Sequence, residues 1–94
     1  MTTKQDLMDE ICNQLGLPKF LVSRGSTEPR DFLVAVAEQL GIVGGYPYLD
    51  KSSLGRRIVE AGGRTWLPSY DSSGGTVTKD GLTAILETVQ RLVR

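Results

Sequence analysis

The stretch TKDGLTAILETVQRLVR, residues 78–94, has the most regular pattern in the chain and decides the fold. Its apolar residues recur three and four positions apart, a spacing that places them on one side of an α-helix. Asp80 near the start and Arg91 and Arg94 near the finish suit the helix dipole. We therefore expect a helix from Thr78 to the chain end whose apolar side forms core. That side comprises Leu82, Ile85, Leu86, Val89, Leu92 and Val93.

Three more helices are expected upstream, over residues 3–16, 29–40 and 51–61. The first two end in matching sequences, QLGL and QLGI, in which a glycine can take the left-handed conformation that stops a helix. We interpret this echo as one helix stop used twice, since nothing else in the two segments aligns. Side chains able to cap the three starts are Thr3 for the first, Thr27 or Glu28 for the second, and Asp50 or Ser52 for the third.

The segment RTWLPSYDSSGGTVT, residues 64–78, has β-prone residues at each end and serines and glycines at its centre. It is typical of a small hairpin or an ordered loop. Trp66 is expected to fill the core where this segment crosses it, and Gly55 is expected to mark the close approach of another backbone. The predicted fold is therefore a single, mainly α-helical domain over residues 1–94, with four helices and a hairpin or loop before the last. Inward positions expected on the two middle helices are Phe32, Leu33, Val36, Leu40, Leu54, Ile58, Val59 and Ala61.

The composition excludes most enzyme chemistry. There is no histidine and only one cysteine, so Ser-His-Asp and Cys-His arrangements and the usual zinc sites cannot form. The glycine pairs lack the lysine and hydroxyl of a phosphate-binding loop. We expect no catalytic residue, no metal and no cofactor, and Cys12 is expected to pack as a small hydrophobic residue.

The longest uninterrupted apolar run, residues 32–37, is far shorter than the ~20 residues that a membrane span needs. Charged residues among the first ten positions exclude a signal peptide at this start. We therefore expect a soluble, cytoplasmic protein without a membrane partner.

Positive charge is concentrated in one part of a chain whose net charge is zero. Between Lys51 and Arg64 four basic residues face one acidic residue, Glu60. Basic side chains at the outer side of a helix, with hydroxyl groups at its N-terminus, suit contacts to DNA phosphates. The predicted nucleic-acid-binding residues are Lys51, Ser52, Ser53, Arg56, Arg57, Arg64 and Lys79, with residues 72–75 as a wing tip.

The order of helix 29–40, helix 51–61 and segment 64–78 resembles a winged helix-turn-helix. The ten residues 41–50 depart from the short turn of that motif, which leaves the orientation of the third helix open. The sequences VSRGST, SSLGRRIVEAGG and WLPSYDSSGGTVTKDGL are also similar to small helical accessory domains of bacterial restriction endonucleases. That resemblance implies a non-catalytic module of a restriction-modification system that helps a nuclease engage DNA or its partner subunits.

Two other interpretations stay open. The basic cluster is also typical of an ordinary solvated helix. The chain is alternatively a protein interaction domain, as a part of a larger protein, that docks a partner through Tyr46, Tyr48, Trp66 and Leu67. Charge placement separates these interpretations. Arg56, Arg57 and Arg64 on one exposed face unbroken by carboxylates would favour DNA contact, whereas their neutralisation by Glu60 and Asp71, with an apolar patch elsewhere, would favour the interaction domain.

Overall fold

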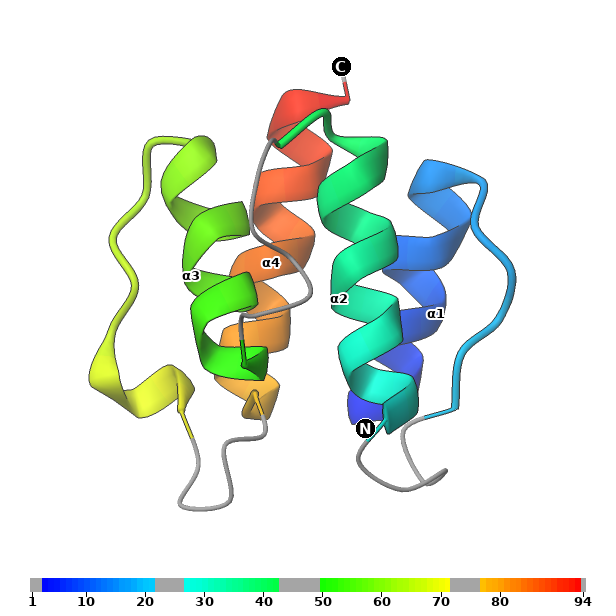
Figure 1. Ribbon diagram of the computed structural model, residues 1–94, viewed down its shortest axis with the longest axis horizontal. Coiled ribbons are helices and arrows are strands. Elements are labelled where there is room, and N and C mark those ends of the chain that lie inside the picture. The colour runs from blue at the N-terminus through cyan, green and yellow to red at the C-terminus, as the bar shows by residue number, and fades with distance from the viewer. Residues whose placement is uncertain (1–2, 22–26, 43–49, 72–76, 94) are drawn as a thin grey trace.

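The computed structural model describes residues 3–21, 27–42, 50–71 and 77–93, without the side chains of Thr27 and Ser52. These residues form four α-helices and one short 3-10 helix (Figure 1). Their bounds are α1 Lys4–Leu15, α2 Thr27–Gln39, α3 Lys51–Ala61, η2 Pro68–Tyr70 and α4 Lys79–Leu92. The expected mainly helical fold with four helices is confirmed. The expected start of α2 at Pro29 is wrong, because the helix already includes Thr27 and Glu28.

All four α-helices run in the same direction, each beginning at the lower end of the molecule in Figure 1. Parallel neighbours require the chain to return after each helix. Residues 16–21 run back beside α1 and residues 62–67 run back beside α3 (Figure 1). The closest helix pairs are α1 with α4, α2 with α3, and α3 with α4. As a result, four helix N-termini lie at one end of the bundle and four C-termini at the other.

Three of the helix starts are capped by side chains, and the caps of α1 and α3 are among those that the sequence predicts. The Thr3 hydroxyl accepts a hydrogen bond from the Asp6 N–H, and the Asp6 carboxylate accepts one from the Thr3 N–H, which is a complete capping box. The Asp50 carboxylate caps α3 and the Thr78 hydroxyl caps α4. These bonds satisfy backbone donors that have no partner inside the helix.

The helix stops are also alike. Gly16, Gly41 and Gly63 all have left-handed φ angles of 70°, 73° and 80°. After each glycine, the next N–H bonds a carbonyl five residues back: Leu17 to Cys12, Ile42 to Ala37 and Arg64 to Val59. This 6→1 bond defines the Schellman motif. The single helix stop that the sequence uses twice therefore appears a third time, at the end of α3.

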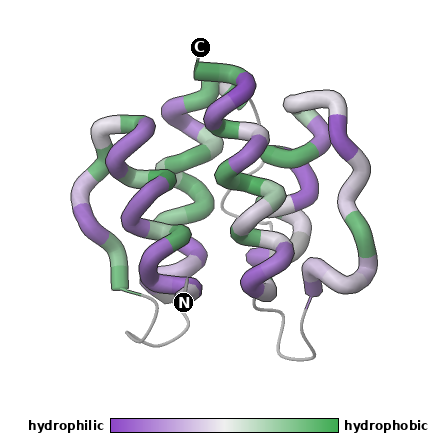
Figure 2. Tube along the Cα trace, turned by 180° about the vertical axis from the view of Figure 1, so that it is seen from behind, coloured by the Kyte–Doolittle hydropathy of each residue, from purple (hydrophilic) through white to green (hydrophobic). Residues whose placement is uncertain are grey.

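Along each helix, apolar and polar residues alternate in the way expected of a helix with one buried side (Figure 2). The expected core positions on α2 and α3 are buried except Leu40, which is partly buried, and Ala61, which is exposed. On α4 the last turn departs from the prediction, because Leu92 and Val93 are 43% and 46% exposed. Residues 90–93 are all exposed, so no other described element covers that turn, and its apolar spacing does not mark core.

The segment before α4 is ordered where it is described. It contains η2 and an isolated antiparallel bridge between Asp71 and Val77. The Thr78 N–H donates to the Tyr70 carbonyl at 2.8 Å, and the Thr78 hydroxyl donates to the Ser69 carbonyl at 3.0 Å. Within the described ranges this segment has no strand, and the expected wing tip at residues 72–75 lies outside them.

None of the helices in the described part of the chain is long and apolar enough to cross a membrane.

Candidate functional site

The exposed side of α3 carries Arg56 and Arg57. Leu54, Gly55, Ile58 and Val59, which flank the two arginines in the sequence, are all buried. The helix is therefore fixed by its inner side, while both arginine side chains point to solvent. The two cations therefore stand on a rigid helix and stay hydrated in the folded protein.

A carboxylate shares this exposed side. Glu60 is exposed and lies three and four residues after Arg57 and Arg56, positions that are neighbours on a helix surface. The exposed side of α3 is therefore a mixed surface with two positive charges and one negative charge. The condition that would favour DNA contact, an arginine face unbroken by carboxylates, is therefore not met on α3.

Arg64 does not belong to the exposed side of α3. Its Nη1 lies 2.6 Å from Oε1 of Glu87 on α4, and the two side chains are 36% and 52% exposed. Salt bridges at such exposure contribute little to stability, about 0–1 kcal/mol. The pair nevertheless directs the Arg64 guanidinium toward α4, away from Arg56 and Arg57.

A hollow of about 420 Å³ opens where the end of α3 meets the last turns of α4. We call it the arginine groove; it is lined by Arg64, Glu87, Gln90 and Arg91. Nη1 of Arg91 donates to the Gly62 carbonyl at 3.4 Å, which is longer than the usual 2.7–3.2 Å of an N–H···O bond. Sequence reasoning assigned Arg91 only to the helix dipole. The available signal was its spacing from Glu87, since residues four apart share one side of a helix.

The two predicted lysines lie at the other end of the bundle. Lys51 and Lys79 are the first residues of α3 and α4, whose N-termini share that end (Figure 1). Lys79 is exposed, whereas Lys51 is partly buried, three residues before Leu54 and thus on the inner side of α3. The expected position of Lys51 beside Arg56 is therefore wrong. Lys51 lines a small, mainly apolar hollow with Met8, Pro29, Phe32, Leu33, Val77 and Leu82.

The start of α3 already uses a backbone donor that was expected to serve phosphate. The Ser53 N–H donates to Oδ1 of Asp50 at 2.8 Å. This bond also lowers the pKa of the Asp50 carboxyl, because it stabilises the charged form. An anion at this helix start would compete with a carboxylate. The Ser52 side chain lies outside the described residues.

Trp66 fills the core, as predicted. Its side chain is 6% exposed, and its indole N–H donates to Oδ1 of Asp71 at 3.1 Å. Its ring packs edge-on against the ring of Tyr70, with 5.1 Å between the two ring centroids. A Cβ at Gly55 would lie 2.6 Å from the indole of Trp66. This glycine therefore makes room for the tryptophan side chain, and not for another backbone as expected. Trp66 is not exposed for a partner to contact in this structure. Tyr46 and Tyr48, which were proposed with it, lie outside the described residues.

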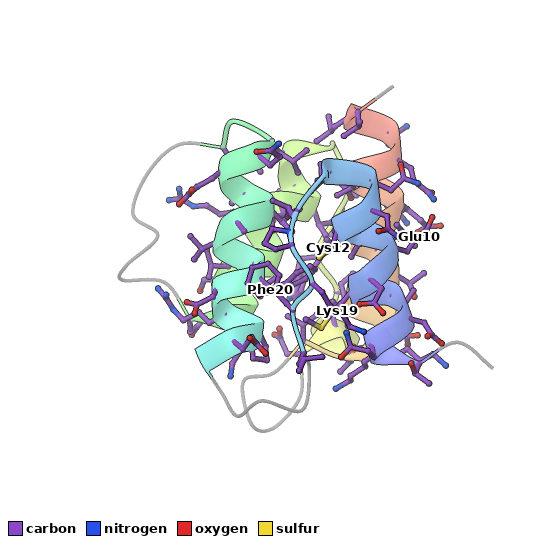
Figure 3. The ribbon with its side chains drawn as sticks, turned by 90° about the vertical axis from the view of Figure 1, so that its right-hand side faces the viewer. Glu10, Cys12, Lys19 and Phe20 are labelled. Carbon is purple, nitrogen blue, oxygen red and sulfur yellow. The ribbon has the colours of Figure 1, made fainter. Side chains whose placement is uncertain are left out.

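Cys12 packs as a small hydrophobic residue, which confirms the prediction. It is 3% exposed between α1 and residues 16–21, as Figure 3 shows, and burial raises the pKa of its thiol. A thiol kept in its neutral form is a poor nucleophile. The return segment is fixed beside it, because Phe20 packs edge-on against Phe32 of α2 at 5.9 Å.

In the part of the chain that the structure describes, no three cysteine, histidine or acidic side chains are grouped so that they could hold a metal ion. Comparisons with protein-family models, curated proteins and solved structures find no match to this chain.

Proposed function

We propose that this chain is a non-enzymatic module that engages DNA phosphates through the exposed side of α3. The observation that carries the proposal is the position of Arg56 and Arg57, both exposed on a helix that is anchored by buried Leu54, Ile58 and Val59. A guanidinium presents several N–H donors and binds phosphate oxygens well. With two arginines and Glu60 nearby, such contact is weak and suits an accessory module better than a protein that binds DNA alone.

The remaining predicted residues take secondary places in this proposal. Lys79 is exposed at the start of α4, and Arg64 would have to leave Glu87 to reach a phosphate. A winged-helix-like arrangement is part of the proposal, with residues 64–71 following α3 as the described part of the wing. Because α2 and α3 run parallel, contact along the side of α3 is favoured over insertion of its N-terminus into a groove.

The likeness to accessory domains of bacterial restriction endonucleases supports a setting in a cytoplasmic restriction-modification system. In that setting the module adds phosphate contacts to a nuclease that supplies catalysis and sequence reading. The alternative of a protein interaction domain that docks through Tyr46, Tyr48 and Trp66 has less support, because Trp66 is buried.

A titration of a labelled DNA duplex at about 50 mM and about 200 mM salt tests the proposal, because each phosphate contact contributes about 0.9 to the salt slope. Two contacts predict a slope near −1.8, which weakens parent binding by about tenfold between these salt concentrations. The double variant Arg56→Ala/Arg57→Ala should lose both the binding and its salt dependence while its circular dichroism stays helical.

Arg91→Ala is the matched control, since it removes an exposed arginine from a different helix. It should bind DNA like the parent. An unchanged affinity in the double variant, or no binding by the parent at the lower salt concentration, contradicts the proposal.

A further inference from the structure

The arginine groove is a second polar surface that the proposed DNA contact does not use. It is an open hollow of about 420 Å³ at the surface. It lies at the C-terminal ends of α3 and α4, and the residues that line it include none from the exposed side of α3. Its chemistry can therefore be changed without touching Arg56 or Arg57.

Donors outnumber acceptors among the side chains that line the arginine groove. Among the described residues of the lining, Arg64 and Arg91 each carry five N–H donors and Gln90 carries two, whereas Glu87 is the single carboxylate. One Arg64 nitrogen bonds Glu87, and the long bond from Arg91 to the Gly62 carbonyl is weak. Of the part of the lining that the structure describes, Arg64, Arg91 and Glu87 are the titratable groups, and their charges sum to one positive charge. The class of ligand that this set fits is an oxyanion.

Apolar side chains next to the arginine groove narrow the class of partner. Leu92 and Val93 directly follow Arg91 and are exposed at the last turn of α4, which no other described element covers. A sugar–phosphate backbone offers little apolar surface to cover them, whereas a peptide can present carboxylates and apolar side chains together. Arginine clusters beside apolar residues are a common mode of recognition for acidic protein segments.

We propose that the arginine groove docks an acidic segment of a protein partner, whose carboxylate pairs with Arg91 and the free donors of Arg64 while its apolar side chains cover Leu92 and Val93. Glu87 has two effects on this docking. It holds Arg64 toward the groove through the 2.6 Å contact, and its negative charge repels the incoming carboxylate. Glu87 thereby favours partners with enough carboxylates to compete with it.

The test uses the full chain and two labelled peptides, one alternating aspartate with leucine and one alternating asparagine with leucine. Fluorescence anisotropy should show tighter binding of the aspartate peptide. Arg91→Ala should weaken that binding by about two- to fivefold, the range of a partly exposed ion pair, and leave the asparagine peptide unaffected. Arg56→Ala/Arg57→Ala should leave both peptides unaffected, which separates this proposal from DNA contact by α3.

Glu87→Gln should change the affinity for the aspartate peptide in the opposite direction to Arg91→Ala. Glutamine still accepts the hydrogen bond from Arg64 but carries no charge, so the aspartate peptide should bind about two- to fivefold more tightly. Equal binding of the two peptides, or weaker binding in Glu87→Gln, overturns the proposal. Loss of DNA binding in Arg91→Ala, with peptide binding unchanged, would assign the groove to nucleic acid instead.

Discussion

The arginines on the exposed side of α3 and those in the arginine groove are the same kind of side chain in two different settings. Arg56 and Arg57 share their surface with Glu60 and stand on a helix whose inner side is buried. Arg64 and Arg91 connect α4 to the end of α3, through Glu87 and the Gly62 carbonyl. Arg64 must share its guanidinium between Glu87 and any ligand, which suits a specific carboxylate, whereas the exposed position of Arg56 and Arg57 on α3 suits contact with phosphates.

The support beneath each arginine pair also differs. The exposed side of α3 depends on the packing of Trp66 against Gly55 on the buried side of the same helix. The arginine groove depends on a partly exposed ion pair. Buried packing is worth several kcal/mol and an exposed ion pair at most about 1, so α3 should keep its shape under conditions that loosen the groove.

The contact between Trp66 and Gly55 gives the largest expected effect. Trp66→Ala should lower the free energy of unfolding by about 3–5 kcal/mol. Gly55→Ala should lower it by about 1–3 kcal/mol, because its Cβ would meet the indole at 2.6 Å. In the Trp66→Ala background the same Gly55→Ala change should instead add about 1 kcal/mol, the helix preference of alanine over glycine.

Urea unfolding of the four proteins measures this cycle, with Leu67→Ala as the control for an exposed neighbour. If Gly55→Ala costs the same in both backgrounds, the indole is not what requires glycine at this position.

Features that depend on neighbouring residues could be predicted from the sequence. The caps Thr3 and Asp50 and the glycine stops of α1 and α2 each follow from a few consecutive residues, and they lie where expected. The last turn of α4 could not be judged in this way. Periodicity says which side of a helix is apolar, but it does not say where the neighbouring helices end.

The distribution of charge depends on contacts between distant residues and was predicted less well. Arg64 and Glu87 are 23 positions apart, and nothing near either residue indicates their pairing. The inward position of Lys51 was available from the sequence, since it precedes Leu54 by three residues on a helix. The basic residues are close together along the chain, and the sequence analysis treated them as one cluster. In the structure they are divided among the exposed side of α3, the arginine groove and the N-terminal end of the bundle.

The second largest expected effect on stability comes from the cap of α3. This cap acts on the helix that carries Arg56 and Arg57 and not on the arginine groove. Asp50→Ala should lower stability by about 0.5–2 kcal/mol near neutral pH. The pKa of Asp50 is lowered in the folded state by the Ser53 N–H, so its contribution is present above the ordinary pKa of an aspartate. It is lost as the pH falls through the lowered value.

The stability gap between parent and Asp50→Ala should therefore narrow in acid, as measured by urea unfolding at about pH 6 and about pH 2.5. Asp50→Asn should keep most of the cap at both pH values, because asparagine caps helices about as well as aspartate. A gap that is equal at the two pH values would show that the charge on Asp50 has no part in holding α3.

The smallest effect concerns the arginine groove. A double-mutant cycle of Arg64→Ala and Glu87→Ala should give a coupling free energy of about 0.2–1 kcal/mol, since both side chains are partly exposed. The coupling should shrink when the salt concentration rises toward about 1 M, where charges are screened within about 3 Å. The Gly55–Trp66 cycle has no charge and should keep its coupling in the same salt. A coupling between Arg64 and Glu87 that does not change with salt would mean that packing, and not charge, holds the two side chains together. The arginine groove and the exposed side of α3 would then both depend on packing.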